Sequence, residues 1–255
     1  SPILVVPYMW IGDFVRCHTV VRLLAQRFPS CPIDLLATQL VAPLADYMPG
    51  VRKAIVFDLP RRRLALGQHW ALAQLLKRER YGQALIMPRT WKAALAPCLA
   101  GIPTRTGFFG EARVGVLNDL RFGERNLPRM IDRCVALSAP VGEALAKELP
   151  VPQLRVTPTE LEEWRSRMGL TTDGRRIVAL APGAVGPSKR WQMASFGQLA
   201  AQLTTLGHSV WVLGGPGEQE AARHIAHQGG SGVLDLTGPD LRNAILALAA
   251  ADVAV

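Results

Sequence analysis

The sequence predicts an α/β protein made of two tandem, doubly wound parallel sheets, and three observations support this fold class. Short apolar runs alternate with helix-like stretches along the 255 residues, as in parallel sheets with crossover helices. This alternation stops at four prolines between positions 139 and 158 and then restarts. The length suits one large domain or two modest ones. We therefore expect one domain at 1–150 and a second, incomplete one at 151–255.

The composition is that of a folded protein. Hydrophobic residues make up 49% of the chain and charged residues 19%, which is too apolar for a disordered protein. No apolar run approaches the roughly 20 residues needed to cross a bilayer. Four cysteines are too few for a disulfide scaffold. Collagen, coiled-coil and membrane-span interpretations are therefore excluded.

The four cysteines are predicted to be reduced thiols in the core. Cys17, Cys31, Cys98 and Cys134 form no CxxC pair and have no histidine at zinc-motif spacing, which argues against a zinc site. All four lie in or beside apolar segments, where a free thiol packs as a small hydrophobic group. No signal peptide is visible, so we expect a cytoplasmic protein.

The elements of the first half follow from apolar runs and helical periodicity. Strands buried on both faces read as continuous apolar runs. The first helix has Val15, Thr19 and Leu23 on one face and is ended by Pro29. We predict strands at 3–6, 33–37, 54–57 and 84–87, and helices at 13–28, 39–47, 68–80 and 91–100.

The second half repeats the pattern after the proline-rich connection, in which a short helix is expected at 141–149. Strands are predicted at 177–181, 210–213 and 233–236, and helices at 160–168, 194–206, 218–227 and 241–250. The final run, 252–255, reads as a strand whose following loop is missing, and Ser1 precedes the first strand without an initiator Met. We therefore expect the chain to be part of a longer protein.

Ligands of such sheets bind beyond the carboxyl ends of the strands, which makes the loops after the strands the candidate sites. The first of these loops, residues 7–13, contains Gly12 and Asp13. Asp13 either caps the following helix or serves as a general base. The loop has no GxGxxG, so the dinucleotide fingerprint is absent.

The loop at 181–191 has the composition of a phosphate site. Gly183 and Gly186 allow backbone amides to approach a ligand, and Ser188, Lys189 and Arg190 add a hydroxyl and two cations. The spacing is not that of a Walker A loop. The alternative is a surface loop that carries Lys and Arg by chance.

Two further loops after strands extend this candidate site. Glu218 follows a glycine-rich turn and either accepts hydrogen bonds from ribose hydroxyls or complements a helix dipole. Thr237 and Gly238 follow the next strand and are expected to line the same crevice, and Asp240 is expected to cap the next helix.

The net charge of +9 lies entirely in the first part of the chain. Residues 1–150 hold 20 Lys and Arg against 11 Asp and Glu, whereas residues 151–255 hold nine of each. This is either a solvated surface or the mark of an anionic partner, such as nucleic acid, an anionic lipid surface or a phosphorylated glycan. The candidate cations, on loops after strands or near them, are Arg61, Arg62, Arg63, Arg89 and Lys92, with Arg105 in a segment after a helix.

Taken together, these loops resemble glycosyltransferase family 9, the ADP-heptose:lipopolysaccharide heptosyltransferases. Five stretches carry the resemblance in the right order: Trp10-Ile11-Gly12-Asp13, residues 100–108 with 115–119, residues 181–184 with 186–191, residues 213–216 with Glu218, and Leu236-Thr237-Gly238. The family usually continues into an Asn-Asp-Ser-Gly-type loop that holds the donor diphosphate, and this chain ends before it. Residues 61–63 match no family signature.

The resemblance implies a GT-B fold, in which two Rossmann-like domains face each other across a cleft. It implies an acceptor site on the first domain and a nucleotide-sugar site on the second. The implied reaction is inverting transfer of L-glycero-D-manno-heptose from ADP-heptose to the first heptose of the lipopolysaccharide inner core. By resemblance, Asp13 is the catalytic base, Lys189 binds the donor phosphates and Glu218 lies near the adenosine; no metal or other cofactor is required.

The implied acceptor is the anionic heptosyl-Kdo2-lipid A. Its lipid lies in the inner leaflet, so we expect peripheral attachment at the inner face of the inner membrane. Two alternatives remain: another sugar-nucleotide transferase of the same fold, and a non-catalytic tandem Rossmann-like protein that binds nucleotides or nucleic acid. RNA binding predicts exposed aromatics interleaved with cations, and the first domain offers only Trp91 beside Lys92, and Trp70.

Overall fold

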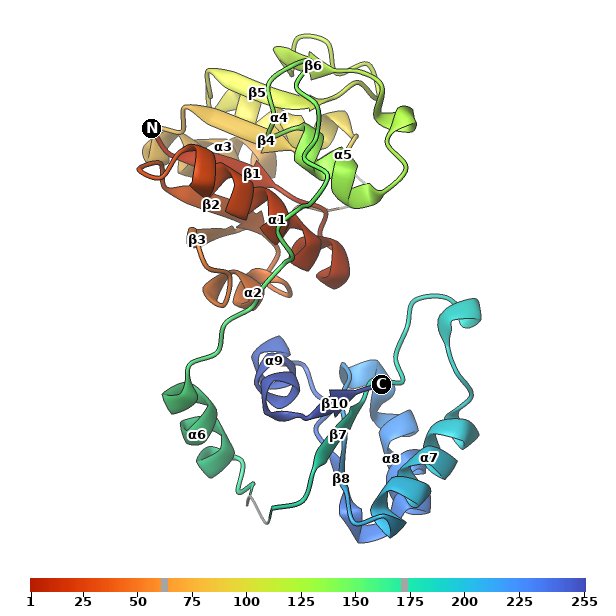
Figure 1. Ribbon diagram of the computed structural model, residues 1–255. Helices are drawn as coiled ribbons and strands as arrows, with labels where there is room; N and C mark the ends of the chain where they lie inside the picture. The colour runs from red at the N-terminus through yellow and green to blue at the C-terminus, as the bar shows by residue number, and fades with distance from the viewer. Residues whose placement is uncertain (61–63, 171–173) are drawn as a thin grey trace. The chain divides into compact units, whose positions relative to one another are not determined.

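The computed structural model describes residues 1–60, 64–170 and 174–255, and these form two compact units (Figure 1). The first unit is Ser1–Arg155 and the second is Val156–Val255. The sequence predicts this division after position 150. Each unit has its own parallel sheet and its own hydrophobic core, as the predicted α/β class requires.

The first unit contains a six-stranded, fully parallel sheet in the order β3-β2-β1-β4-β5-β6. Its strands are β1 (Ile3–Val6), β2 (Ile33–Ala37), β3 (Val51–Val56), β4 (Gln83–Ile86), β5 (Thr104–Phe108) and β6 (Asp119–Arg121). The strand order reverses between β1 and β4. In a doubly wound sheet, the loops that follow these two strands flank the crevice where ligands bind.

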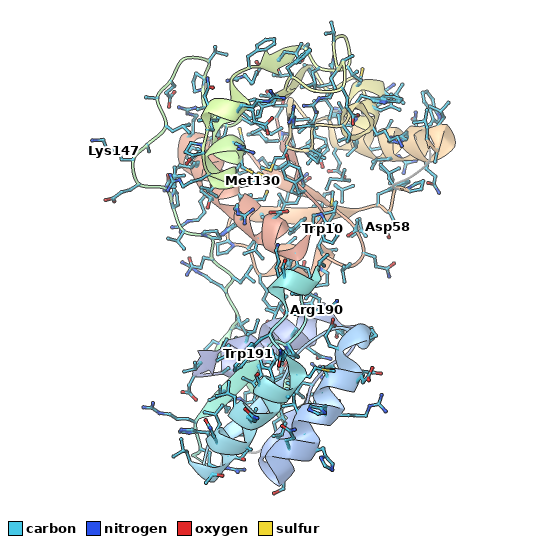
Figure 2. All side chains as sticks on the ribbon, turned by 90° about the vertical axis from the view of Figure 1, so that its right-hand side faces the viewer. Trp10, Asp58, Met130, Lys147, Arg190 and Trp191 are labelled. Carbon is cyan, nitrogen blue, oxygen red and sulfur yellow. The ribbon has the colours of Figure 1, made fainter. Side chains whose placement is uncertain are left out.

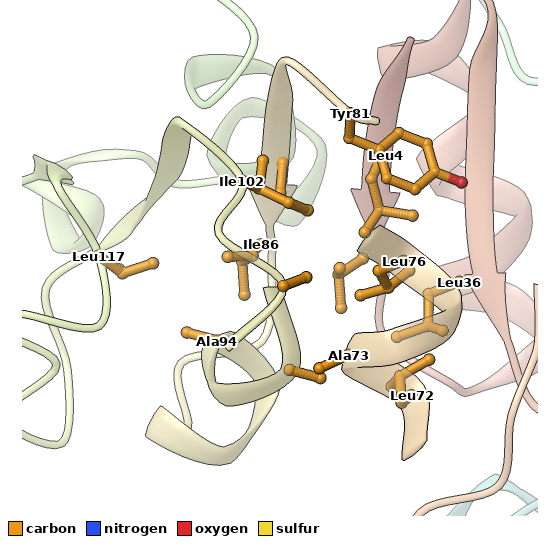
Figure 3. Packing of buried hydrophobic residues seen from close by; sticks show 14 residues of the cluster. Leu4, Leu36, Leu72, Ala73, Leu76, Tyr81, Ile86, Ala94, Ile102 and Leu117 are labelled. Carbon is orange, nitrogen blue, oxygen red and sulfur yellow. The ribbon is translucent and has the colours of Figure 1, made fainter. Parts of the chain in front are cut away.

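Helices cover both faces of this sheet, which explains why β1 and β2 consist of buried residues throughout. Helices α3 and α4 pack together, and so do α1 and α5. Figure 3 shows the core on the α3 and α4 side, where Leu4 and Ile86 from the sheet meet Leu72 and Leu76 from α3. The helices are α1 (Ile11–Arg27), α2 (Ala42–Asp46), α3 (Leu66–Glu79), α4 (Trp91–Leu99) and α5 (Met130–Ala136), with the 3-10 turn η1 (Glu124–Asn126).

Arg105 lies in a strand and not in a loop, which corrects the sequence-based expectation. It is part of β5, and its guanidinium donates to the carbonyl oxygens of Val116 at 2.7 Å and Ile102 at 2.6 Å. The strand was missed because Thr-Arg-Thr-Gly is not an apolar run. The role of Arg105 is therefore structural: it ties the turns on either side of β5 to the strand.

The helix expected at 141–149 does not form, and the chain there is irregular. Gly142 has a φ of 81°, outside the right-handed helical region, and Pro150 disfavours a helical backbone at Leu149 before it, so a helix cannot run through the whole segment. The segment that follows lies along α1. Thr19 Oγ1 donates to the Pro150 carbonyl at 2.8 Å, and the Gln153 N–H donates to Nδ1 of His18 at 2.9 Å.

The second unit has a four-stranded parallel sheet in the order β10-β7-β8-β9. Alternate residues of β8 point to opposite faces. Val210 and Val212 join the core that α7 and α8 cover, whereas Trp211 packs edge-on against Trp164 of α6 at 6.0 Å. The elements are α6 (Pro158–Arg167), β7 (Ile177–Leu180), η2 (Pro187–Lys189), α7 (Met193–Thr205), β8 (Ser209–Val212), η3 (Pro216–Glu218), α8 (Gln219–Gly229), η4 (Gly230–Gly232), β9 (Val233–Asp235), α9 (Leu241–Ala250) and β10 (Val253–Ala254).

The remaining sequence-based expectations concern cysteines and membrane spans. All four cysteines are free thiols; Cys17 and Cys134 are buried as expected, but Cys31 and Cys98 are only partly buried. Asp240 caps α9 as expected, because its carboxylate accepts the Arg242 N–H at 2.9 Å. Among the described residues, no helix is both long enough and apolar enough to span a bilayer.

Candidate functional site

Asp13 lies in the first turn of α1, directly after the loop that follows β1. The N-cap of this helix is Trp10, so Asp13 does not cap it, contrary to one of the two sequence-based alternatives. Its carboxylate forms an ion pair with Arg16, one turn further along the same helix, and a quarter of its side chain stays exposed. The carboxylate of Asp13 is therefore fixed by Arg16 and still accessible to solvent or a ligand.

A cluster of polar side chains lies beneath this loop. Burial and the nearby Glu124 carboxylate raise the pKa of the Tyr8 phenol to about 12. Burial raises the pKa of the Cys134 thiol to about 11, and the charges of both Arg16 and Asp13 act on it. The cluster therefore connects the surroundings of Asp13 to those of Glu124, which begins the 3-10 turn η1 after β6.

Arg89 is brought to the same edge of the sheet as Asp13. It follows β4, the neighbour of β1 at the point where the strand order reverses, and its Nε lies 3.0 Å from Oε2 of Glu124. Lys92 lies in the first turn of α4. Burial and the charge of Lys92 lower the pKa of His69 on α3. The other three predicted cations, Arg61, Arg62 and Arg63, lie outside the described residues.

Arg113 is part of this edge and was missed by the sequence analysis. Its side chain is fully buried, and burial lowers its pKa. The guanidinium donates to the carbonyl oxygen of Pro88, at 2.7 Å, and to that of Phe108, so it joins the loop after β4 to the loop after β5. No pattern distinguishes this arginine from the exposed ones, because its burial depends on contacts between distant segments.

The second unit presents its own loops at the carboxyl ends of β7, β8 and β9. Lys189 ends the 3-10 turn η2 and is exposed, as is Ser188. Arg190 closes this loop on itself, since its Nε donates to the Ala184 carbonyl at 2.8 Å. The next residue, Trp191, packs edge-on against Phe196 of α7 at 5.0 Å; Figure 2 labels both Arg190 and Trp191 on this loop.

Glu218 interlocks the loops after β7 and β8. Its Oε2 accepts the Gly215 N–H at 2.8 Å. A Cβ on Gly183 would come within 2.8 Å of the Glu218 side chain, and one on Gly214 within 2.7 Å. Position 214 therefore favours glycine, because the Cβ of Glu218 cannot move without the backbone, whereas at Gly183 the end of the Glu218 side chain occupies the space that the sequence analysis assigns to a ligand.

The loop after β9 joins the same group. The Gly238 N–H donates to the Gly214 carbonyl at 2.9 Å. Thr237 bonds within its own loop, with its hydroxyl donating to Oδ1 of Asp235 at 2.6 Å and its N–H to the same oxygen at 2.8 Å. We call the three connected loops, residues 181–192, 213–218 and 236–240, the donor loops, after the nucleotide-sugar site that the resemblance implies for this part of the chain. Glycine-rich backbone next to an exposed lysine at the ends of parallel strands suits a phosphate-bearing ligand.

Comparison with known proteins gives these loops a context. The model of glycosyltransferase family 9 (heptosyltransferase) matches residues 69–255. The chain is 36% identical over 230 residues to lipopolysaccharide heptosyltransferase 2 of Escherichia coli K12, and 34% identical over 231 residues to lipooligosaccharide heptosyltransferase 2 of Haemophilus influenzae. In both cases the alignment covers 88% of this chain and 66% of the relative, so the chain spans just under two thirds of their length.

A solved structure shows the same similarity in three dimensions. The E. coli ADP-heptose lipopolysaccharide heptosyltransferase II superposes with a TM-score of 0.90 at 32% sequence identity. That superposition covers 100% of this chain and 78% of the other.

Proposed function

Since this chain belongs to glycosyltransferase family 9 and has the two-sheet architecture of GT-B heptosyltransferases, we propose that it takes part in an inverting heptosyl transfer. The donor is ADP-heptose carrying L-glycero-D-manno-heptose, and the acceptor is the first heptose of the lipopolysaccharide inner core. The observation that carries the proposal is the 36% identity, over 88% of this chain, to a relative named as a lipopolysaccharide heptosyltransferase 2. The connected donor loops agree with it.

Asp13 is the proposed general base. Its carboxylate removes the proton from the attacking acceptor hydroxyl while that oxygen forms a bond to the anomeric carbon of heptose. The bond from that carbon to the ADP oxygen breaks in the same displacement, which inverts the configuration. Arg16 supports this role because it holds the carboxylate in one place yet leaves a quarter of it exposed.

Lys189 is the proposed partner of the donor phosphates. The departing ADP gains negative charge, so a nearby ammonium group stabilises the transition state more than the bound substrate. Because Lys189 supplies this charge, the proposal requires no metal or other cofactor. The other proposed donor contacts are Gly183, Ser188, Thr237 and Gly238. Oε1 of Glu218 accepts a hydrogen bond from a ribose hydroxyl, while Oε2 accepts the Gly215 N–H.

The first unit is the proposed acceptor side. An acceptor such as heptosyl-Kdo2-lipid A carries carboxylates and phosphates, which suit the positive charge of this unit. Arg89 and Lys92, together with Arg61, Arg62 and Arg63, are the proposed acceptor contacts. An acceptor anchored in lipid implies that the protein works as a peripheral protein at the inner face of the inner membrane, on the cytoplasmic side.

A transfer assay with the full-length protein tests this proposal. The delipidated heptosyl-Kdo2 acceptor is incubated with ADP-heptose, with ADP-glucose and with UDP- and GDP-sugars, and products are identified by mass spectrometry. We expect a gain of one heptose from ADP-heptose alone, unchanged by EDTA. Transfer from another sugar nucleotide, or binding of nucleotide without any transfer, would contradict the proposal.

A further inference from the structure

A cavity of about 500 Å³ opens at the carboxyl ends of β5 and β6 in the first unit. Its lining includes Arg89, Phe109, Glu111, Phe122, Glu124 and Arg125. We propose that this cavity is a subsite for an acidic sugar residue of the acceptor, with two phenyl rings as its stacking surface and Arg125 as the partner for the carboxylate. The inference rests on the proposed function and names the part of the acceptor that this unit recognises.

The first observation is a pair of exposed aromatic rings. Phe109 and Phe122 stack with ring centroids 5.6 Å apart and planes 23° apart. Phe109 is nevertheless 47% exposed and Phe122 is 72% exposed. The face of a phenyl ring carries partial negative charge, and the C–H bonds of a pyranose ring present partial positive charge. The outer faces of the pair therefore suit the apolar face of a sugar.

The second observation is the charge of the lining. Three arginines and two glutamates line the cavity, and Arg121 is already paired with a carboxylate, since its Nε lies 2.8 Å from Oδ1 of Asp119. Glu124 pairs with Arg89 at 3.0 Å, and Oε2 of Glu111 accepts the backbone N–H of Trp91 at 3.2 Å. Arg125 is exposed, and its planar fork matches a carboxylate. Arg125 is thus the lining arginine that pairs with no carboxylate among the described residues, and it suits an anionic ligand.

These charges also decide between a sugar and a lipid chain. An acyl chain in this cavity would remove arginine and glutamate side chains from water without offering them hydrogen bonds, which is costly. An acidic sugar offers hydroxyl groups and a carboxylate to the same side chains. Exposed phenyl rings next to charged side chains are an arrangement that suits a sugar.

The third observation is that the sheet fixes the positions of the two rings. Phe109 and Phe122 each directly follow a strand, and β5 and β6 pair in parallel with Phe108 opposite Arg121. The Phe109 N–H donates to the Arg121 carbonyl at 2.8 Å, so the sheet holds the two rings side by side. Figure 1 shows β5 and β6 at one edge of their sheet. A rigid platform loses little conformational entropy on binding.

Strained backbone forms another part of the wall. Glu111 and Ala112 both have positive φ, at 42° and 50°, which is unfavourable for side chains other than glycine. A Cβ on Gly110 would come within 3.0 Å of the Arg89 carbonyl oxygen, so the turn fits tightly against the loop after β4. Strain of this kind persists where the surroundings enforce it, and it concentrates at ligand sites. Arg89 links this wall to the edge of the sheet that carries Asp13.

Direct binding tests the subsite without requiring turnover. The full-length protein is titrated calorimetrically with the delipidated heptosyl-Kdo2 glycan in the absence of donor. We expect Phe109→Leu and Phe122→Leu, which keep bulk but remove the ring, each to raise Kd roughly tenfold, as loss of one good contact does. The ADP affinity stays unchanged. Phe28→Leu, which alters an exposed ring at the opposite end of α1, is the matched control and leaves Kd unchanged.

A carboxyl-reduced form of the same glycan tests the arginine. Arg125→Gln should weaken binding of the native glycan roughly tenfold and leave binding of the reduced glycan unaltered, because the lost contact is to a carboxylate. The subsite is overturned if the ring variants bind the glycan as wild type does, or if they lose affinity only for lipid-bearing acceptor in vesicles. A wild-type protein that binds the glycan but transfers no heptose would instead refute the proposed function and leave the subsite standing.

Discussion

At the residue scale, a substitution of Asp13 should change the rate of transfer without changing the affinity for ADP. Asp13→Asn keeps the size of the side chain but cannot accept the proton, so we expect kcat to fall by roughly 10²- to 10⁴-fold. The ADP affinity should stay within a factor of about two, because Asp13 belongs to the first unit and the proposed ADP site to the second. Steady-state kinetics and ADP titration measure both quantities.

The ion-pair partner of Asp13 supplies the control. Arg16→Gln leaves the carboxylate in place and removes only the group that holds it, so the loss of kcat should be smaller than in Asp13→Asn. Near-normal turnover in Asp13→Asn would reduce Asp13 to a favourable charge in the first turn of a helix.

The burial of His18 predicts that the stability of the first unit depends on pH. The ring is fully buried, its Nδ1 accepts the Gln153 N–H, and its Nε2 lies 2.8 Å from the Pro49 carbonyl oxygen. Burial lowers its pKa from 6.5, so below pH 6.5 the unfolded chain binds a proton that the folded chain does not. The free energy of unfolding of the first unit should therefore fall as the pH drops below 6.5, by at most about 1.4 kcal/mol per pH unit for one proton.

Urea denaturation at pH 7.5 and pH 5.5 measures this effect. His18→Gln should flatten the pH dependence, although it lowers the stability at pH 7.5. His69 is a second buried histidine whose pKa is lowered, so His69→Gln should remove a separate share of the slope. A His18→Gln protein with the full wild-type slope would show that His18 is not the responsible group.

Sequence patterns identified several candidate side chains but not their partners. Asp13, Lys189 and Glu218 were picked out because each sits in a loop after an apolar run. The ion pair of Asp13 with Arg16, the packing of Glu218 on Gly183 and the burial of Arg113 depend on how distant segments meet. Such contacts follow from tertiary structure, which residue spacing does not encode.

At the element scale, the three donor loops are in contact with one another, and a substitution of Gly183 tests whether this contact matters for nucleotide binding. In Gly183→Ala, the new Cβ would lie 2.8 Å from the Glu218 side chain, so the carboxylate end of Glu218 must move away from the loop after β7. We expect the ADP affinity to fall roughly tenfold while Tm changes by no more than about 4 °C, because the strands themselves are untouched. Calorimetry and thermal melting give the two readings.

Gly217 is the matched control, because a Cβ there meets nothing within 4 Å. Gly217→Ala should bind ADP as the wild type does. An unchanged ADP affinity in Gly183→Ala would mean that the fit of Glu218 against the loop after β7 does not matter to the nucleotide.

The elements that the sequence predicts well are those with the strongest local signal. The buried strands at 3–6 and 33–37 were predicted with their observed bounds, because a continuous apolar run has one stable place in a doubly wound sheet. β5 and β6 were missed because their residues are mixed and their pairing depends on β4. The helix expected at 141–149 was wrong because helix-forming side chains there could not overcome the neighbouring prolines and Gly142.

At the scale of the whole molecule, the charge is divided more sharply than the sequence-based boundary suggests. The first unit holds 21 Lys and Arg against 11 Asp and Glu, a net +10, and the second holds eight against nine, a net −1. Attraction between exposed charges is screened over about 8 Å at physiological ionic strength. If the first unit binds an anionic acceptor, the acceptor KM should rise with salt more steeply than the donor KM.

Kinetics of the full-length protein from 25 to 400 mM salt, a range chosen to span the Debye lengths above and below that value, test this expectation. Arg89→Gln with Lys92→Gln, and separately Arg61, Arg62 and Arg63 changed to Ser, should raise the acceptor KM at low salt and reduce its salt slope. The donor KM should not respond. Equal slopes for both substrates, with an unchanged acceptor KM in both variants, would mean that the charge serves only as a solvated surface.

The chain leaves the first unit along the helix that carries Asp13. Residues 150–153, on their way out of the unit, are fastened by Thr19 and His18, and both side chains belong to α1. His18 follows Asp13 by five residues, about one and a half turns of the same helix. The segment that leaves the unit is therefore attached to the helix that carries the proposed base, and two residues further on the Arg155 N–H donates to the Tyr47 carbonyl at 2.8 Å. The segment that leaves the first unit and the carboxylate of Asp13 are both held by α1.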